Sequence, residues 1–301
     1  MIDAFVEYIA VEKKYSPRTV SAYADALNEF AVFVGEDLSR ESVTRLTEDQ
    51  VRDWVLYLVE VKHNAPRSVK QKLAALHTFF KFLLRQGVVG KDITRRVQPP
   101  KVDKPLPVFF KRDEMVAATA YDDQADDAVS LRDCLIIEML FQTGMRRAEM
   151  VGLQDSDVDT GQKQVRIFGK RRKERIVPIG DKLCDLIERY REARGETNGT
   201  FFVRWKKDGT CVPLTVQSLY KVVTDRMGEV STLKKHSPHV LRHTFATAML
   251  NNGADIRTIQ MLLGHASLAA TQVYTHTTLD QVMKTYQMAH PRARKQHTNN
   301  Q

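Results

Sequence analysis

A proline-rich stretch at the end of the first third of the chain interrupts the hydrophobic pattern on either side of it. Residues 95–109 read RRVQPPKVDKPLPVF, with four prolines, several charges and no period in the apolar positions. Proline without glycine or serine favours an extended, semi-rigid connector. Because 301 residues suffice for two cores of ordinary size, this stretch predicts a boundary between two domains. The alternative is an irregular surface loop within one domain.

Before this boundary, apolar residues recur every three to four positions, which is the spacing of an amphipathic helix. Four such stripes are found, in residues 2–9, 20–34, 51–58 and 69–84. The second should begin at Ser16 and Pro17, an N-cap followed by proline at the first helical position. The fourth should open near Pro66 and close at Gly87. With short connections, the four helices should pack as a small bundle.

After the boundary, helical segments alternate with short strand-like ones. Helices are predicted over Glu114 to Ala120, over Leu131 to Phe141, and in several segments from Thr215 onward. Strands are predicted over Gln164 to Ile167 and Arg175 to Ile179, with Phe201 to Val203 as a third. The fold class expected for the second domain is therefore mainly α with a small antiparallel β-sheet.

Charge and cysteine content narrow the class of protein. Lysine and arginine number 46 against 37 aspartate and glutamate, a formal net charge of +9 that favours a polyanionic partner, with nucleic acid as the leading candidate. The three cysteines, Cys134, Cys184 and Cys211, form no CxxC or CxxH pair, so we expect neither a disulfide framework nor a zinc site. A reducing cytoplasm fits this usage, and no apolar run is long enough to predict a membrane span.

Two motifs place arginines at helix starts. In FQTGMRRAEMVGL a helix should end at Gly144, and the next should begin near Arg146, where Glu149 can hold the guanidinium three residues on. In SPHVLRHTF a helix should begin at Ser237 and Pro238, with His239 and Arg242 on one face and able to reach one anion. Taken singly, each motif is better explained as an ordinary surface pair or helix-start ion pair.

A third motif, GKRRKERIVP, crowds basic residues into the turn between two predicted strands. A hairpin tip this basic suits a DNA groove, and a lysine there could protonate a leaving oxygen. The alternative is a tip that only increases solubility. The basic residues before the second strand are Lys170, Arg171, Arg172 and Lys173.

The fourth motif, LLGHASLAATQVYTH, contains Tyr274, which suggests that all four motifs belong to one active site. Gly264 should end a helix and leave His265 at the break, and a further helical segment should carry Tyr274. A lone tyrosine is usually an amphipathic core residue. Phosphoryl transfer without a metal needs the groups that the four motifs supply together: two arginines, a lysine, two histidines and a tyrosine. In such a reaction arginines neutralise the non-bridging oxygens, lysine protonates the leaving oxygen, and tyrosine attacks phosphorus.

The order and wording of these motifs, with a late AHPRA, resemble the tyrosine recombinase (phage integrase) family, Xer type, over nearly the whole chain. The resemblance implies a 3′-phosphotyrosyl intermediate and a Holliday junction, without metal, ATP or other cofactor. It implies these catalytic residues: Arg146, Lys173, His239, Arg242, His265 and, as the nucleophile, Tyr274. Arg171 and Arg172 stand where the family usually has small residues, which leaves Lys170 as the alternative proton donor to Lys173.

The resemblance also implies a domain plan, that of a two-domain C-shaped DNA clamp. A helical core-binding (SAM-like) domain would span 1–94, a linker 95–110, and a catalytic domain 111–301. A final helix carrying Val282, Met283, Tyr286 and Met288 would dock into a neighbouring protomer, or alternatively close its own domain. The helix break after Gly264 predicts mobility or partner-dependent placement of residues 266–276. Candidate DNA contacts are Arg18, Arg67, Lys70, Lys72, Lys170, Arg171 and Arg172.

The function implied by the resemblance is site-specific recombination, namely resolution of chromosome dimers at a short, partly symmetric, dif-like site in double-stranded DNA. The expected partners are that DNA, a homo- or hetero-tetramer with a second Xer-type recombinase, and a septal DNA translocase; no membrane is involved. Three alternatives stay open: an integrase or excisionase of a phage or conjugative element, a type IB-like topoisomerase, and a non-catalytic DNA-binding regulator.

Overall fold

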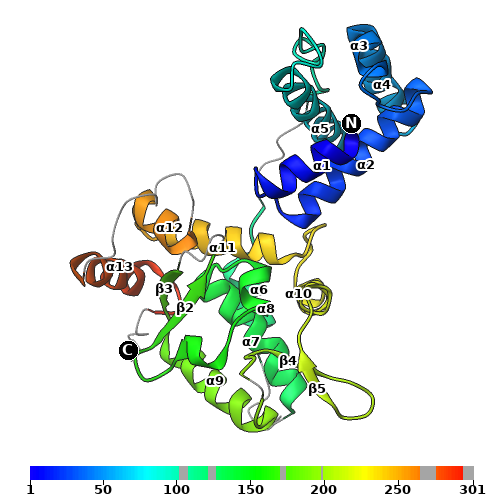
Figure 1. The fold of residues 1–301 in the computed structure, drawn as a ribbon. Helices are drawn as coiled ribbons and strands as arrows, with labels where there is room; N and C mark the ends of the chain where they lie inside the picture. Colours follow the sequence, from blue (N-terminus) through cyan, green and yellow to red (C-terminus); the bar gives the residue numbers. More distant parts are fainter. Residues whose placement is uncertain (102–107, 121–126, 170–173, 198, 265–275, 294–301) are drawn as a thin grey trace. The chain divides into compact units, whose positions relative to one another are not determined.

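The computed structural model describes residues 1–101, 108–120, 127–169, 174–197, 199–264 and 276–293, without the side chains of 276–281 (Figure 1). The chain divides into two compact units, Met1–Pro105 and Leu106–Gln301. In the part of the chain so described, no helix is long and apolar enough to cross a membrane.

The first unit is a bundle of helices. Its elements are α1 (Ile2–Val11), α2 (Pro17–Val34), α3 (Ser42–Arg45), α4 (Glu48–Glu60) and α5 (Pro66–Arg85). The four predicted helices are confirmed, and α2 begins as expected, with the Ser16 hydroxyl accepting the Thr19 N–H at 3.2 Å. Helix α3 was not predicted, because one helical turn is too short to show a period.

Aromatic side chains form the centre of this bundle. The rings of Phe30 and Trp54 meet edge to face at 5.0 Å between centroids, which joins α2 to α4. The rings of Phe5 and Phe79 meet in the same way at 5.3 Å, which joins α1 to α5. All four side chains are fully buried, so each bundle contact gains the large apolar burial that aromatic residues provide.

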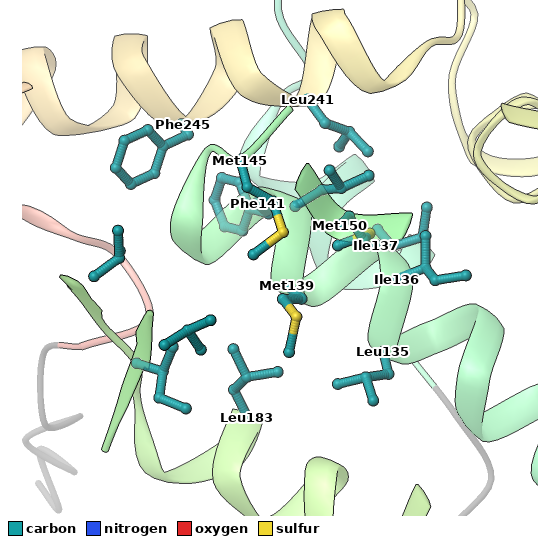
Figure 2. Close-up of a cluster of buried hydrophobic side chains, with 14 of the residues drawn as sticks. Leu135, Ile136, Ile137, Met139, Phe141, Met145, Met150, Leu183, Leu241 and Phe245 are labelled. Atoms are coloured by element: carbon teal, nitrogen blue, oxygen red, sulfur yellow. The ribbon is translucent and has the colours of Figure 1, made fainter. Parts of the chain in front are cut away.

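The second unit is built around one buried helix. Its helices are α6 (Arg112–Ala118), α7 (Ala128–Thr143), α8 (Arg147–Val151), η1 (Asp155–Asp157), α9 (Asp181–Arg194), α10 (Val216–Val230), α11 (Pro238–Asn251), α12 (Ile256–Leu263) and α13 (His276–Ala289). Nearly every residue of α7 from Leu131 onward is buried, as expected of a helix covered on all sides. Helices α9, α10 and α11 contact it, and Figure 2 shows Leu183 of α9 and Phe245 of α11 in the same apolar cluster as the α7 side chains.

In its described residues, the second unit also contains two small antiparallel sheets. The strands β1 (Val158–Asp159), β2 (Gln164–Phe168) and β3 (Glu174–Pro178) pair in that order, and β4 (Val203–Trp205) pairs with β5 (Cys211–Pro213). The prediction of β2 and β3 is confirmed to within one residue, as is the mainly helical fold class. The position predicted for the third strand, Phe201 to Val203, was wrong, because β4 begins only at Val203. Phe201 and Phe202 turn into a cluster with Tyr190 instead, and the strand after them belongs to the second sheet.

The end of α13 is fastened to α7 within the same unit. The Tyr286 hydroxyl donates to the carbonyl of Gln142 at 3.1 Å, and its ring stacks on His290 at 4.8 Å. The Arg292 N–H donates to Nδ1 of His290 at 3.1 Å, so the ring proton lies on Nε2, which donates to the Phe141 carbonyl at 3.3 Å. In this single chain, the predicted C-terminal helix thus packs on its own unit, although Met288 of the predicted stripe is 65% exposed.

Replacement of His290 by glutamine is expected to reduce the loss in free energy of unfolding that occurs as the pH is lowered. Burial lowers the pKa of His290 to about 3, whereas an unfolded histidine titrates near 6.5. Between these values the unfolded chain binds one more proton than the folded chain. The free energy of unfolding should therefore fall by up to ~1.4 kcal/mol per pH unit as pH drops below 6.5. Urea titrations at pH 7 and pH 5 measure this loss.

The matched control is glutamine in place of the exposed His63. That variant should keep the wild-type difference between pH 7 and pH 5, while the His290 variant should show a smaller one. An identical pH dependence in wild type and the His290 variant would contradict a neutral, buried His290.

Candidate active site

Arg146 lies where α7 gives way to α8. Gly144 ends α7 in the left-handed conformation (φ +58°), and a Cβ on it would lie 2.6 Å from the Phe245 ring, so only glycine fits this turn. Arg146 is the N-cap of α8. Its Nη1 donates to Glu149 Oε1 at 2.7 Å, and its backbone N–H donates to Oε2 at 2.8 Å. The predicted hold of Glu149 on Arg146 is confirmed.

Arg242 lies in the second turn of α11, which begins at Pro238 with Ser237 as N-cap, as predicted. Its side chain is buried, and its two terminal nitrogens donate to main-chain carbonyls, Nη1 to Gly144 at 2.5 Å and Nη2 to Leu263 at 2.7 Å. His239 is exposed on the same helix, three residues before. The structure thus brings Arg242 to the end of α7, directly beside the turn that positions Arg146.

Arg175 of β3 is a third arginine of this cluster, and sequence reasoning missed its role. Its side chain is 4% exposed and makes a two-pronged ion pair with Glu149, Nη2 to Oε2 at 2.7 Å and Nη1 to Oε1 at 3.2 Å. A signal was available in the strand pattern. Arg175 shares the buried face of β3 with Val177, and a charged residue on such a face requires a buried partner.

The three arginines meet at the C-terminal end of α12. Gly264 ends this helix in the left-handed conformation (φ +64°), as predicted. The end of a helix exposes unpaired carbonyls and the negative end of the helix dipole, which favours cations. Three consecutive carbonyls are used: Leu262 accepts from Arg175 at 2.7 Å, Leu263 from Arg242 at 2.7 Å, and Gly264 from Arg146 at 3.1 Å.

Positive charge is in excess at this point. Among the described residues of the cluster, three guanidinium groups face one carboxylate, that of Glu149. Arg146 and Arg175 pair with it, whereas Arg242 binds main-chain carbonyls. Burial, followed by the charges of Arg146 and Arg175, lowers the pKa of Arg242 to about 10. Burial alone would raise the pKa of Glu149, but hydrogen bonds and charge from Arg175, with bonds from Arg146, hold it below its usual value. Because Arg146 is 42% exposed, an anion from solvent can reach the cluster.

The other predicted site residues fall into two groups. Outside the described residues lie Lys170, Arg171, Arg172, Lys173, His265 and Tyr274, together with the predicted mobility of 266–276. In the helical unit, Arg18, Arg67 and Lys70 are exposed, on α2 and α5. Lys72 is different, since its ammonium pairs with Glu29 at 2.5 Å across α5 and α2.

Comparison with known proteins identifies the family of the chain. The phage integrase family matches residues 109–280, and the N-terminal SAM-like domain of phage integrases matches residues 2–87. The chain is 36% identical to tyrosine recombinase XerC of Bacillus pumilus over 97% of each chain. It is 38% identical to tyrosine recombinase XerC of Listeria monocytogenes, over 96% of this chain and 97% of the relative.

A solved structure supports the fold. The integrase of transposon Tn1549, in complex with transposon right-end DNA, superimposes with a TM-score of 0.69 over 94% of this chain and 98% of that one, at 16% identity. The family match over more than half of the chain and the two full-length relatives carry the assignment. The chain belongs to the phage integrase family, and it is a tyrosine recombinase of the Xer type that cuts and rejoins DNA at specific sites.

Proposed function

We propose that this recombinase resolves chromosome dimers at a short, partly symmetric, dif-like DNA site, and that Tyr274 is its nucleophile. The observation that carries the chemical part is the meeting of Arg146 and Arg242 on the last carbonyls of α12, immediately before His265 in the sequence. The cluster has an excess of positive charge, and a phosphodiester supplies the missing negative charge. The name and identity of the XerC relatives support the biological part.

The proposed cleavage is a direct displacement at phosphorus. The Tyr274 oxygen forms a bond to the scissile phosphorus as the bond to the 5′ oxygen breaks, leaving a 3′-phosphotyrosyl link and a free 5′-hydroxyl. The phenolic proton passes to a histidine, and Lys173 protonates the departing oxygen. The 5′-hydroxyl of a partner strand reverses these steps. Rejoining needs no ATP, because the phosphotyrosyl link retains the energy of the broken bond.

The arginines and histidines would stabilise the transition state. Each terminal nitrogen of Arg146 and Arg242 that binds a carbonyl carries a second N–H, which would donate to a non-bridging oxygen. His239 and His265 would add hydrogen bonds to the same oxygens. Donors already fixed before the DNA arrives cost little reorganisation when charge develops on the phosphate.

The remaining parts of the proposal concern assembly. The helical domain (1–94) and the catalytic domain (111–301), joined by the linker 95–110, would close on the duplex as a clamp in the cytoplasm. Arg18, Arg67 and Lys70 would contact phosphates, as would Lys170, Arg171 and Arg172. Four protomers, either all of this chain or shared with a second Xer-type recombinase, would act on two duplexes, and a septal DNA translocase would activate them.

Covalent capture on fragmented genomic DNA of the host tests the function. The protein is incubated with nicked fragments, denatured, and recovered with any DNA still attached, which is then sequenced. We expect one partly symmetric site near the replication terminus. Capture at the ends of a mobile element would indicate an integrase instead. Capture without sequence preference, with relaxation of supercoiled DNA, would indicate a topoisomerase, and no attached DNA would exclude the cleavage chemistry.

A further inference from the structure

We propose that Arg175 is a positioning residue for DNA cleavage: through Glu149 it orients the guanidinium of Arg146, and through Leu262 it fixes the end of α12. The proposal rests on the proposed function, in which Arg146 binds the scissile phosphate. The Arg175 side chain is 4% exposed, and within the described part of the chain it donates to the Leu262 carbonyl and to both carboxylate oxygens of Glu149. It therefore acts through its neighbours rather than on the DNA.

The link to Arg146 passes through one carboxylate. Each oxygen of Glu149 accepts one N–H from Arg175 and one from Arg146, at distances between 2.7 and 3.2 Å. The side chains of Glu149 and Arg175 are 6% and 4% exposed, whereas that of Arg146 is 42% exposed. A buried pair thus holds a half-exposed guanidinium. Without Arg175, two of the four donors that fix the carboxylate are lost, and Arg146 is held by a carboxylate free to rotate.

The link to α12 is a hydrogen bond combined with close packing. The Nε of Arg175 donates to the carbonyl of Leu262 at 2.7 Å. The guanidinium also lies against Gly264, where an added Cβ would be 3.1 Å from Nη1. Arg146 binds the Gly264 carbonyl at 3.1 Å. Arg175 therefore contacts both groups that hold Arg146, the carboxylate on one side and the helix end on the other.

Only arginine has the shape for this double role. Its planar fork can pair with a carboxylate through two N–H groups while Nε serves a third acceptor, whereas lysine presents one ammonium at the end of a flexible chain. Lysine at position 175 keeps the charge next to Glu149 but cannot hold both neighbours in place. Arg175→Lys is therefore the informative variant, since it separates charge from positioning.

The test measures the single-turnover rate of covalent adduct formation on a nicked duplex carrying the captured site. Two substrates are compared, a normal scissile phosphate and a methylphosphonate, in which a methyl group replaces one non-bridging oxygen and removes the negative charge. On the phosphate, Arg175→Lys should lower the rate by ~10- to 100-fold, the scale of a misplaced catalytic group, with DNA affinity changed by less than about threefold. On the methylphosphonate the deficit should shrink to within about threefold of wild type, because the charge that Arg146 neutralises is absent.

The control is Arg194→Lys, which changes another buried arginine remote from this cluster. Arg194 is 5% exposed, pairs with Asp155 at 2.5 Å, and donates to the carbonyl of Thr200 at 3.2 Å. This variant should react at the wild-type rate on both substrates. Glu149→Gln, which is isosteric and breaks the same link from the other side, should reproduce the pattern of Arg175→Lys and serves if that variant folds poorly.

The outcomes separate the two proposals. If wild type forms no adduct, the proposed function fails and the positioning role fails with it. If wild type forms the adduct and Arg175→Lys matches it on the phosphate, only the positioning role is overturned. An equal deficit of Arg175→Lys on both substrates also overturns it, because a general loss of folded structure does not depend on the charge of the substrate.

Discussion

Tyr274→Phe is expected to abolish covalent attachment of the protein to DNA. The variant keeps the aromatic ring but lacks the only atom that could bond to phosphorus at this position, so no neighbouring residue can replace the step. We expect adduct formation to fall by at least ~10⁴-fold, to the detection limit, in keeping with the scale of loss when a nucleophile is removed. The assay is denaturing electrophoresis of protein with a labelled nicked duplex. Binding of the duplex, measured by gel shift, should remain within about threefold of wild type.

Tyr220→Phe is the matched control for this experiment. Tyr220 lies on α10 with 40% of its surface exposed, so its hydroxyl can be removed at little cost to the core. This variant should form the adduct at the wild-type rate. Persistent adduct with Tyr274→Phe, or its loss with Tyr220→Phe, would show that the nucleophile has been assigned to the wrong tyrosine.

Arg242→Lys is expected to have the second largest effect. One ammonium cannot serve both the Gly144 and the Leu263 carbonyls and still reach a phosphate, so the rate of adduct formation should fall by ~10²- to 10³-fold, the loss typical of one preorganised donor. Stability should fall as well, by ~1–3 kcal/mol, because one buried carbonyl loses its partner. Single-turnover kinetics at saturating protein and urea titration measure the two losses separately.

Arg194→Lys again separates catalysis from folding. It also removes bonds from a buried arginine to main-chain carbonyls, so its loss of stability should be similar. Its rate per folded molecule should not change. Comparable rate losses in the two variants would mean that Arg242 contributes to cleavage only by keeping the domain folded.

Local signals explain what could be read from the sequence. Ser16, Gly144 and Gly264 mark helix ends through their own conformational preferences and those of their immediate neighbours, so their positions were predictable. The contact of Arg146 with Glu149 was predictable for the same reason, since the two residues are three apart on one helix start.

Features that depend on distant partners were not predictable from periodicity. The strand after Phe202 was misplaced because both phenylalanine rings pack against Tyr190 of α9 in the core. The strand pattern could have shown that Arg175 is buried and needs a partner, but not that one partner is the carbonyl of Leu262, 87 residues further along the chain. A backbone group carries no side-chain signal, so no pattern of residue types could point to it.

The end of α12 therefore has a consequence for how such enzymes can diverge. Its three carbonyls hold the arginines at a spacing set by the rise of the helix, and every amino acid offers the same carbonyl. Exchange of one apolar side chain for another along this helix leaves the three carbonyls in place. An insertion or deletion before Gly264 would instead move the carbonyls that bind all three guanidinium groups. Because backbone carbonyls rather than side chains position the arginines, we expect relatives to vary in the residues of this helix but to keep its length.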